Sequence, residues 1–313
     1  MHSRMYIFSL LFIPLFFMGC APELRLNKVT TLSNYPSGSG IVYINNKLFV
    51  IGDDVNYLLI ADTAFNITGS IRLYDSLDKR IPKPLKQDLE AAAVVTIGSS
   101  QKILLTGSGS LSPYRNAGWL VDPAGKENIP LNLDVFYKRL KAEGMDALNI
   151  EGLTEIPRGM VLASRGNRSF RINFLIFTDR EFWKNQDSAN IKIMKVGTNT
   201  DTASFSGVSG LEYSKASVRL LLTVSTENTS SVLEDGTIGK SYLWIIDYIS
   251  AKKRMMAINP NRVIDLEAAD ERFKGHKIES VCIIGENRKS MEVVLVADDD
   301  NGTSTLFNVT IKK

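Results

Sequence analysis

The chain repeats one pattern five times: an apolar run, a short polar stop, a second apolar run, another stop and a third apolar run. The first runs of the five units follow one another at intervals of 51, 61, 58 and 70 positions. Units of that length, with several short strands each, are typical of a β-propeller, in which every repeat is one blade. The residues that lead the five first runs are Ser39, Glu90, Glu151, Ser209 and Glu279.

The second and third runs of each unit support this interpretation. The second runs, such as 48–51 and 293–297, are apolar without alternation, which indicates strands buried on both faces inside a blade. A weaker fourth strand is predicted in units one to four, for example over 67–73 and 191–196. The third runs end on aspartates that are expected to begin hairpin turns, namely Asp62, Asp122, Asp179 and Asp247.

The fifth unit ends after three strands, at 310–311, and a matching strand is available at 24–29. Pairing the two would close the ring and remove two open sheet edges. We therefore predict an all-β protein, a β-propeller of five four-stranded blades closed by an N-terminal strand. A six-bladed ring is the alternative. Helices are predicted over 133–145 and 266–273, on one face of the ring, where they would partly roof the channel.

The first residues predict export and anchoring. A basic start, a short apolar run and the small residue Gly19 before Cys20 are typical of a secretory signal, and the run is short for a membrane span. Met18-Gly19-Cys20 resembles the bacterial lipobox, in which the cysteine is lipidated. The predicted domains are a signal peptide over 1–19 and one propeller domain over 20–313. The resemblance implies an outer-membrane lipoprotein on the periplasmic side, with plain secretion or a retained anchor as alternatives.

Composition excludes several classes of function. The formal net charge is only +3, so no basic field indicates bound nucleic acid. Cys282 is the one thiol beyond Cys20, so the domain has no internal disulfide or cysteine metal site, and an apolar run around it predicts a buried residue. His276 is the only histidine outside the signal, which argues against a Ser-His-Asp triad.

In a blade, the start of the first strand and the end of the antiparallel second strand lie at the same face. The sequence therefore gathers Glu90, Glu151 and Glu279 at one channel mouth as a candidate site for calcium or magnesium, because hard ions prefer oxygen ligands. The alternative is structural: each glutamate accepts backbone hydrogen bonds and pairs with Arg165. The second-strand ends add Asp53, Asp54 and Ser108 to this face.

Further polar residues at this face are candidates for binding a ligand. Arg165 could clamp an anion with its guanidinium or neutralise Glu151, and both interpretations stay open. The string 298–302 is expected to form an Asn-Gly hairpin with an acidic tip rather than a calcium loop of the EF-hand type. The candidate ligand-binding residues are Arg165, Asn167, Glu227, Asp298, Ser39 and Ser209.

The strings 88–91, 149–153 and 208–211 resemble the blade starts of phytase-like bacterial β-propellers, the group with "esterase-like activity of phytase". The resemblance implies a propeller with calcium or phosphoester chemistry, and it carries over no catalytic residue. Two hypotheses follow. The first is a lipid-anchored propeller that binds a small anionic ligand or an envelope protein at its acidic mouth. The alternative is a calcium- or magnesium-dependent phosphoester or ester hydrolase. A structural hub for envelope assembly is a third idea.

Overall fold

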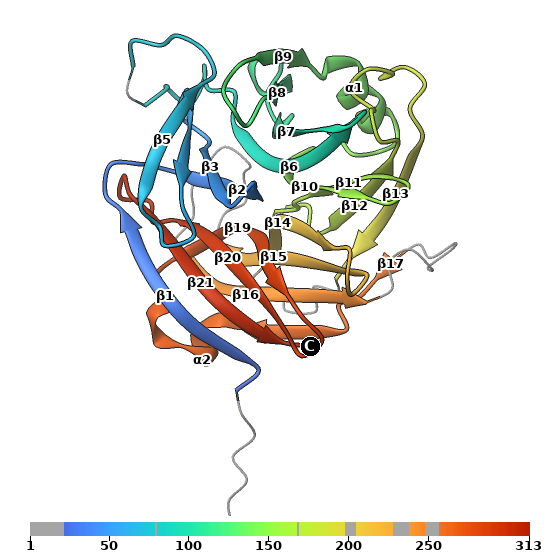
Figure 1. Cartoon of the computed structure of the whole chain (residues 1–313). Helices are drawn as coiled ribbons and strands as arrows, with labels where there is room; N and C mark the ends of the chain where they lie inside the picture. Colours follow the sequence, from blue (N-terminus) through green and yellow to red (C-terminus); the bar gives the residue numbers. More distant parts are fainter. Residues whose placement is uncertain (1–21, 79, 168, 198–204, 228–237, 248–256) are drawn as a thin grey trace, which may run out of the picture.

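The structure is a computed structural model, and it describes residues 22–313 except 79, 168, 198–204, 228–237 and 248–256. Five sheets stand around a common centre, each with its first strand innermost (Figure 1). The protein is therefore an all-β, five-bladed β-propeller, as predicted, and the six-bladed alternative is wrong. The innermost strands are β2 (Gly38–Ile44), β6 (Leu89–Ile97), β10 (Ile150–Ile156), β14 (Phe205–Ser214) and β19 (Lys277–Glu286).

The next strands continue each blade outward through antiparallel pairs. The second strands are β3 (Lys47–Gly52), β7 (Ser100–Gly107), β11 (Gly159–Ser164), β15 (Arg219–Glu227) and β20 (Ser290–Asp298). The third strands are β4 (Tyr57–Ala61), β8 (Ala117–Val121), β12 (Asn173–Thr178), β16 (Ile238–Asp247) and β21 (Ser304–Lys312). The fourth strands of blades one to four are β5 (Ile67–Arg72), β9 (Asn128–Asn132), β13 (Ile191–Val196) and β18 (Arg262–Asp265).

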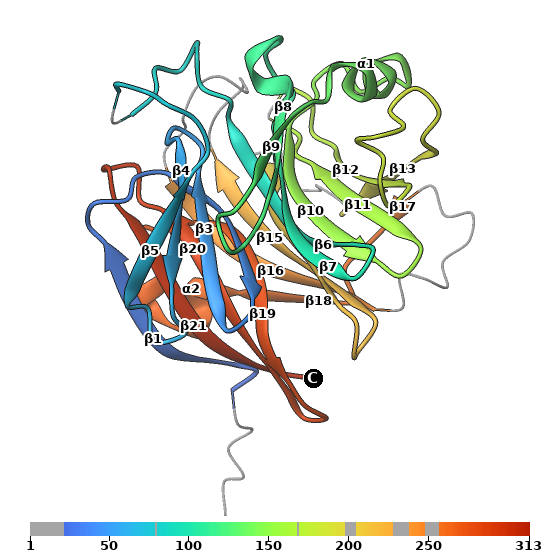
Figure 2. The ribbon, with the colours of Figure 1, turned by 45° about the horizontal axis from the view of Figure 1, so that its top comes forward.

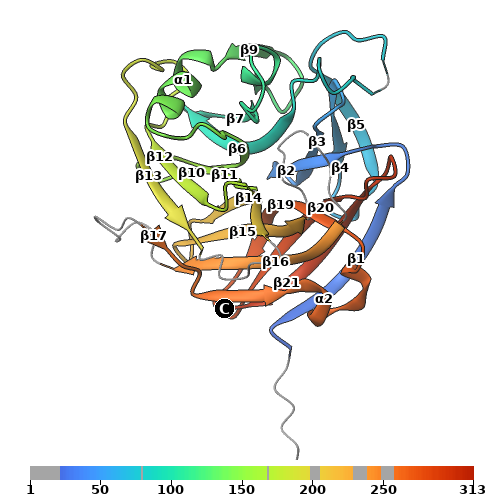
Figure 3. The same ribbon diagram turned by 180° about the vertical axis from the view of Figure 1, so that it is seen from behind.

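The ring is closed by the N-terminal strand β1 (Leu24–Leu32), which forms the outer strand of blade five. It runs antiparallel to β21, with Leu24 opposite Ile311 and Leu32 opposite Ser304, and the two strands lie side by side in Figure 3. The closure is as predicted. Blade three differs from the prediction, because a short fifth strand, β17 (Ala257–Ile258), pairs parallel to β13.

The core lies between the blades, where the second strands are buried on both faces. Every residue of β11 is buried, and β3 is buried throughout except at Lys47. Figure 2 shows the sheets facing one another around the ring, so each pair of neighbouring blades encloses apolar side chains. Cys282 is a buried free thiol in the core that blades five and one share, as predicted.

The two predicted helical segments are present, but they do not roof the channel. Helix α1 (Asp134–Ala142) buries Phe136, Tyr137 and Leu140 in the core between blades two and three. Helix α2 (Leu266–Ala269) and the 3-10 helix η3 (Glu271–Phe273) bury Leu266 and Phe273 between blades four and five. Their apolar side chains fill gaps between sheets. No helix of the described residues has the length and apolar character of a membrane span.

Candidate functional site at the channel mouth

All five lead residues stand at a β-bulge of an innermost strand. The pairing with the second strand shifts register at each of them, so one extra residue opposes none on the partner strand. A bulge bends the strand and redirects a side chain. The bulges thus mark the mouth end of the channel, at the starts of the inner strands, where Ser39, Glu90, Glu151, Ser209 and Glu279 are placed.

The two lead serines connect neighbouring blades. The Ser39 hydroxyl donates to the Leu89 carbonyl at 2.6 Å, and the Ser209 hydroxyl donates to the Ile278 carbonyl at 2.7 Å. Each acceptor directly precedes the lead residue of the next blade. Both serines are buried, so the geometry supports an inter-blade hydrogen bond rather than the ligand contact predicted from sequence.

Replacing Ser209 with alanine is expected to lower the free energy of unfolding by about 1 kcal/mol, because a buried hydrogen bond contributes roughly that much and the Ile278 carbonyl loses its donor. Ser39→Ala should have a similar effect. The measurement is urea unfolding, with Ser99→Ala as the control, because Ser99 lies in an exposed turn. Equal unfolding midpoints for all three variants would contradict a stabilising role of these inter-blade hydrogen bonds.

Glu151 and Arg165 form a buried pair beside the mouth. The Arg165 guanidinium lies 3.8 Å from the Glu151 carboxylate and also donates to Ser225 Oγ of blade four at 3.1 Å. Glu151 accepts a bond of 2.6 Å from the Asn149 amide. These contacts favour the counter-charge interpretation of Arg165 over the anion clamp, because its donors already face Glu151 and blade four.

The remaining predicted residues have separate positions. Lys277 lies 2.8 Å from Glu279, which is buried. The Asn167 side chain accepts from the Ser169 and Phe170 amides at 2.8 Å each, so it shapes a turn. Glu227 ends β15, but its side chain lies outside the described residues, as does the whole of Cys20.

The strongest convergence of carboxylates lies between blades one and two. Oxygens of Asp53, Asp88 and Glu90 all lie within 4.8 Å of one another, close enough to share one cation. We call these three residues the mouth cluster. Glu151 and Glu279 lie outside it, so of the three glutamates predicted to bind metal only Glu90 belongs to the acidic group with ligand spacing among the described residues.

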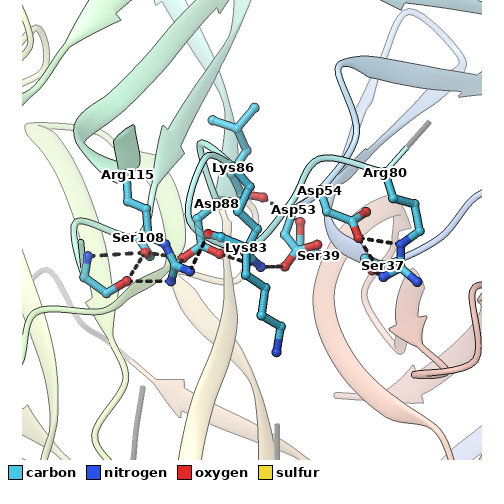
Figure 4. A network of polar contacts seen from close by, with 12 residues as sticks. Ser37, Ser39, Asp53, Asp54, Arg80, Lys83, Lys86, Asp88, Ser108 and Arg115 are labelled. Carbon is cyan, nitrogen blue, oxygen red and sulfur yellow. Dashed lines mark hydrogen bonds and ion pairs between the residues drawn. The ribbon is translucent and has the colours of Figure 1, made fainter. Parts of the chain in front are cut away.

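Two cations stabilise the mouth cluster (Figure 4). The Lys86 ammonium contacts Asp53 and lies 2.7 Å from Asp88 Oδ1. The Arg115 guanidinium lies 2.7 Å from Asp88 Oδ2, which also accepts from the Ser108 hydroxyl. Asp88 is held at a φ of 53°, a conformation uncommon for residues other than glycine and often associated with functional sites.

Two members of the mouth cluster have unused oxygens. Asp53 Oδ1 is buried without a hydrogen-bond partner among the described residues. The half-buried Glu90 carboxyl also makes no side-chain hydrogen bond with them. A buried oxygen without a donor is costly unless a cation or a proton approaches it. The all-oxygen donor set therefore fits a hard ion such as calcium or magnesium. Such an ion would compete with the Lys86 ammonium group for the carboxylate oxygens.

The pKa values of three titratable groups in and beside the mouth cluster are raised. Burial, reinforced by Asp88, Asp53 and Glu151, raises the pKa of Glu90 well above its usual value. Burial also raises the pKa of Asp53, although Lys86 opposes the shift. Burial would lower the pKa of Lys86, but Asp53, Asp88 and Glu90 outweigh it and raise that pKa. Lys86 stays charged, and Glu90 is the carboxyl most ready to hold a proton.

A cavity of about 540 Å³ opens onto the mouth cluster. Its lining includes Asp53, Asp54 and Asp298, together with residues of the connection between blades one and two, among them Arg80, Lys83 and Lys86. Arg80 lies 2.6 Å from Asp54 Oδ2, so it anchors this connection to blade one (Figure 4). The cavity therefore offers both carboxylates and cations to a ligand.

Sequence reasoning placed Asp53 and Glu90 at this mouth but missed Lys86, Asp88 and Arg115. A signal was present, because the charged residues Lys86, Asp88 and Glu90 recur at a spacing of two around the start of β6. The same spacing joins Asn149 to Glu151 and Lys277 to Glu279. Arg115 follows the loop after β7 in the 3-10 helix η1 (Tyr114–Asn116) and carried no comparable signal.

Stability is expected to fall as pH rises from about 4 to 8. Burial raises the pKa of Asp298 to about 7 and that of Glu212, on β14, to about 8. The unfolded carboxyls ionise near pH 4, so between these values the folded state holds more protons and loses stability with rising pH. Asp298→Asn should flatten the slope of urea midpoint against pH, and exposed Asp187→Asn should not. Parallel slopes would contradict this assignment.

The fold and the mouth define the class of protein: a five-bladed β-propeller with an acidic cluster and a cavity at one end of its channel. The chain belongs to the family of unknown function DUF6929, whose model matches residues 34–311. No curated protein matches the sequence.

Two solved structures illustrate the likeness of fold. The glutaminyl cyclase of Myxococcus xanthus is 11% identical with a TM-score of 0.52, over 93% of this chain and 97% of that chain. The virginiamycin B lyase of Staphylococcus aureus, bound to quinupristin as an inactive variant, is 13% identical with a TM-score of 0.45, over 92% of this chain and 100% of that chain. At 11% identity the glutaminyl cyclase shows a likeness of fold alone.

Proposed function

We propose that this protein is a cell-envelope β-propeller that binds a small ligand at its channel mouth with the help of a divalent cation. The observation that carries the proposal is the mouth cluster, in which three carboxylates meet within 4.8 Å and Asp53 Oδ1 has no partner among the described residues. Calcium or magnesium would be held by Asp53, Asp88 and Glu90. Such an ion would attract an anionic group of the ligand.

The cavity supports an anionic ligand. Arg80 and Lys83 line it together with Asp53, Asp54 and Asp298, so an anion drawn by the cation would also meet cationic side chains. Because Lys86 already neutralises part of the mouth cluster, the incoming cation must compete with its ammonium group. The proposed site is therefore of modest affinity and depends on the position of Lys86.

The lipoprotein signal would orient this site. Leu24 lies opposite Ile311 in blade five, at the end away from Asp298 and the mouth. Lipid on Cys20, only four residues before Leu24, would hold that far end at the outer membrane. The mouth would then face the periplasm. Labelling with tritiated palmitate, abolished by Cys20→Ser, tests the anchor, and unlabelled wild-type protein would overturn it.

A metal-dependent hydrolase of phosphoesters or esters, as the phytase-like resemblance implies, is the second candidate. The feature that favours it is Glu90, whose raised pKa suits a group that donates a proton to a leaving oxygen. A bound divalent ion would supply charge stabilisation beside it. Turnover of p-nitrophenyl phosphate or acetate with calcium, abolished by Glu90→Gln, would support this candidate over pure binding.

Thermal unfolding tests the proposed cation dependence. A cation present at about 100 times its Kd should raise the free energy of unfolding by about 2.7 kcal/mol, which corresponds to about 5 °C or more in Tm. The shift should disappear with a chelator and in Asp53→Asn. An unchanged melting curve with calcium and with magnesium would remove the cation from the proposal.

A further inference from the structure

The end of the ring opposite the mouth carries an unusual distribution of charge. Five tight turns, one per blade, join the first strand to the second at this end, between 44–47, 97–100, 156–159, 214–219 and 286–290. No acidic residue lies among the residues that link the strands in these turns. Basic residues lie in three of these links, at Arg158, Lys215, Arg288 and Lys289, and Lys47 begins the strand after a fourth; all five are exposed. We call these five residues the basic ring.

The basic ring is free to meet a partner. None of its members forms an ion pair or a side-chain hydrogen bond with a residue that the structure describes. The nearest basic groups, by contrast, are engaged: Lys102 pairs with Asp122 at 2.7 Å, and Lys313 with Glu286 at 2.7 Å. Charges without a partner are available to bind an anion, because no local contact has to be broken.

Several acidic residues in the outer hairpins at the same end are held by local contacts. Each outer hairpin has its turn aspartate held locally: Asp62 accepts from Asn66, and Asp179 accepts from Asn190. Asp247 pairs with Arg219 at 2.7 Å. These contacts offset part of the negative charge around the basic ring, while Glu155 and Glu212 line a cavity beside Lys215 on the inner strands.

We infer that the basic ring docks this end of the propeller on a membrane surface that carries anionic phospholipid headgroups. The chain itself argues for this partner. β1 starts at the same end, with Leu24 opposite Ile311, and a lipid on Cys20 would lie at most about 14 Å from it in an extended chain. That reach is comparable to the distance over which headgroup charge acts in salt, about 8–10 Å.

A basic patch beside a lipid anchor adds an electrostatic attraction to anionic headgroups. The basic ring fills that role from the folded domain, with five cations distributed around the channel axis rather than along one strand. Docked in this way, the domain stands upright with its mouth cluster away from the bilayer. The orientation part of this inference rests on the proposed anchor, whereas the attraction to headgroups does not.

Vesicle sedimentation measures the attraction of the basic ring to headgroups separately from the effect of the lipid anchor. The chain from position 20 onward, with Cys20→Ser so that no lipid is attached, is mixed with vesicles of phosphatidylcholine alone or with about 30% phosphatidylglycerol. We expect binding only to the anionic vesicles, with a loss of about tenfold or more between 0.1 M and 0.5 M NaCl. This outcome is independent of lipidation and of any ligand at the mouth.

Two matched triple variants locate the surface. Lys47→Gln, Arg158→Gln and Arg288→Gln together should weaken vesicle binding about tenfold or more, because each cation near an anionic surface contributes about fivefold. Lys138→Gln, Lys141→Gln and Lys274→Gln remove the same charge away from the inner turns and should bind as the parent does. Melting temperatures of both variants should stay close to that of the parent, because the ion pair that the second variant loses, between Lys138 and Asp134, lies at the surface and contributes little to stability.

Three results would overturn the inference: no binding to anionic vesicles at 0.1 M NaCl, equal binding of the two triple variants, or equal binding to neutral vesicles. Binding to soluble polyphosphate without binding to vesicles would overturn it too, because the basic ring would then serve a soluble anion.

Discussion

Replacing Lys86 with methionine is expected to lower the free energy of unfolding by about 3–5 kcal/mol at pH 7.5, the largest effect of any single change proposed for this protein. Lys86 is buried and contacts both Asp53 and Asp88. Its removal leaves three carboxylates within 4.8 Å and only Arg115 to offset them. Removing one partner of a buried ion pair lowers the free energy of unfolding by more than the intact pair contributes, because the remaining charge is buried away from water.

The same variant should be rescued by cations and by acid. Calcium or magnesium can occupy the position of the lost ammonium, so Lys86→Met should gain more stability from either ion than the wild type does. Lowering the pH to 5 should restore part of the loss, because the raised pKa values of Glu90 and Asp53 favour proton uptake by these two carboxyls. Urea unfolding at both pH values, with and without the ion, measures both effects.

Lys83→Met is the matched control, because Lys83 lies on the same connection and lines the same cavity but is exposed. Its effect should stay within about 0.5 kcal/mol. A Lys86→Met protein as stable as the wild type, or one that no cation stabilises, would contradict the role given to the ammonium group.

Glu90→Gln should have opposite effects on stability and on cation binding. Burial and the neighbouring carboxylates raise the pKa of Glu90, so its ionised form is disfavoured in the folded state. Glutamine removes that repulsion and should raise the free energy of unfolding by about 1–2 kcal/mol at pH 7.5, and by less at lower pH, because the raised pKa favours the protonated wild-type carboxyl there.

The affinity for calcium or magnesium should fall about tenfold or more in the same variant, because one of three charged ligands is lost. This combination of higher stability and weaker binding separates a ligand from a structural residue. Glu143→Gln, at an exposed position after α1, should change neither quantity. If Glu90→Gln lost stability, the carboxylate would instead be a structural acceptor.

The sequence predicted the ring well because each part of it leaves a local pattern. Strands buried on both faces require continuous apolar runs, and β11 has one from end to end. The lead residues are recognisable because the bulge recurs in every blade at the same point. Closure by β1 followed from the missing strand in blade five.

The site was predictable only in part. Asp53 and Glu90 stand at repeated positions of a blade, so the fold alone places them at the mouth. Lys86 and Arg115 come from segments without a counterpart in the other blades, and their positions depend on tertiary packing. The direction of the serine hydroxyls was equally hidden, because the same residue can donate to a neighbouring blade or to a ligand.

The central claim is a cation site at the mouth cluster, and calorimetric titration of calcium and of magnesium tests it most directly. The titrations use the wild-type chain, a double variant that carries both Asp53→Asn and Glu90→Gln, and the control variant Glu143→Gln. One ion should bind per wild-type chain and per Glu143→Gln chain, and binding should be lost in the double variant. Absence of binding to the wild type, or binding that survives in the double variant, would contradict the claim.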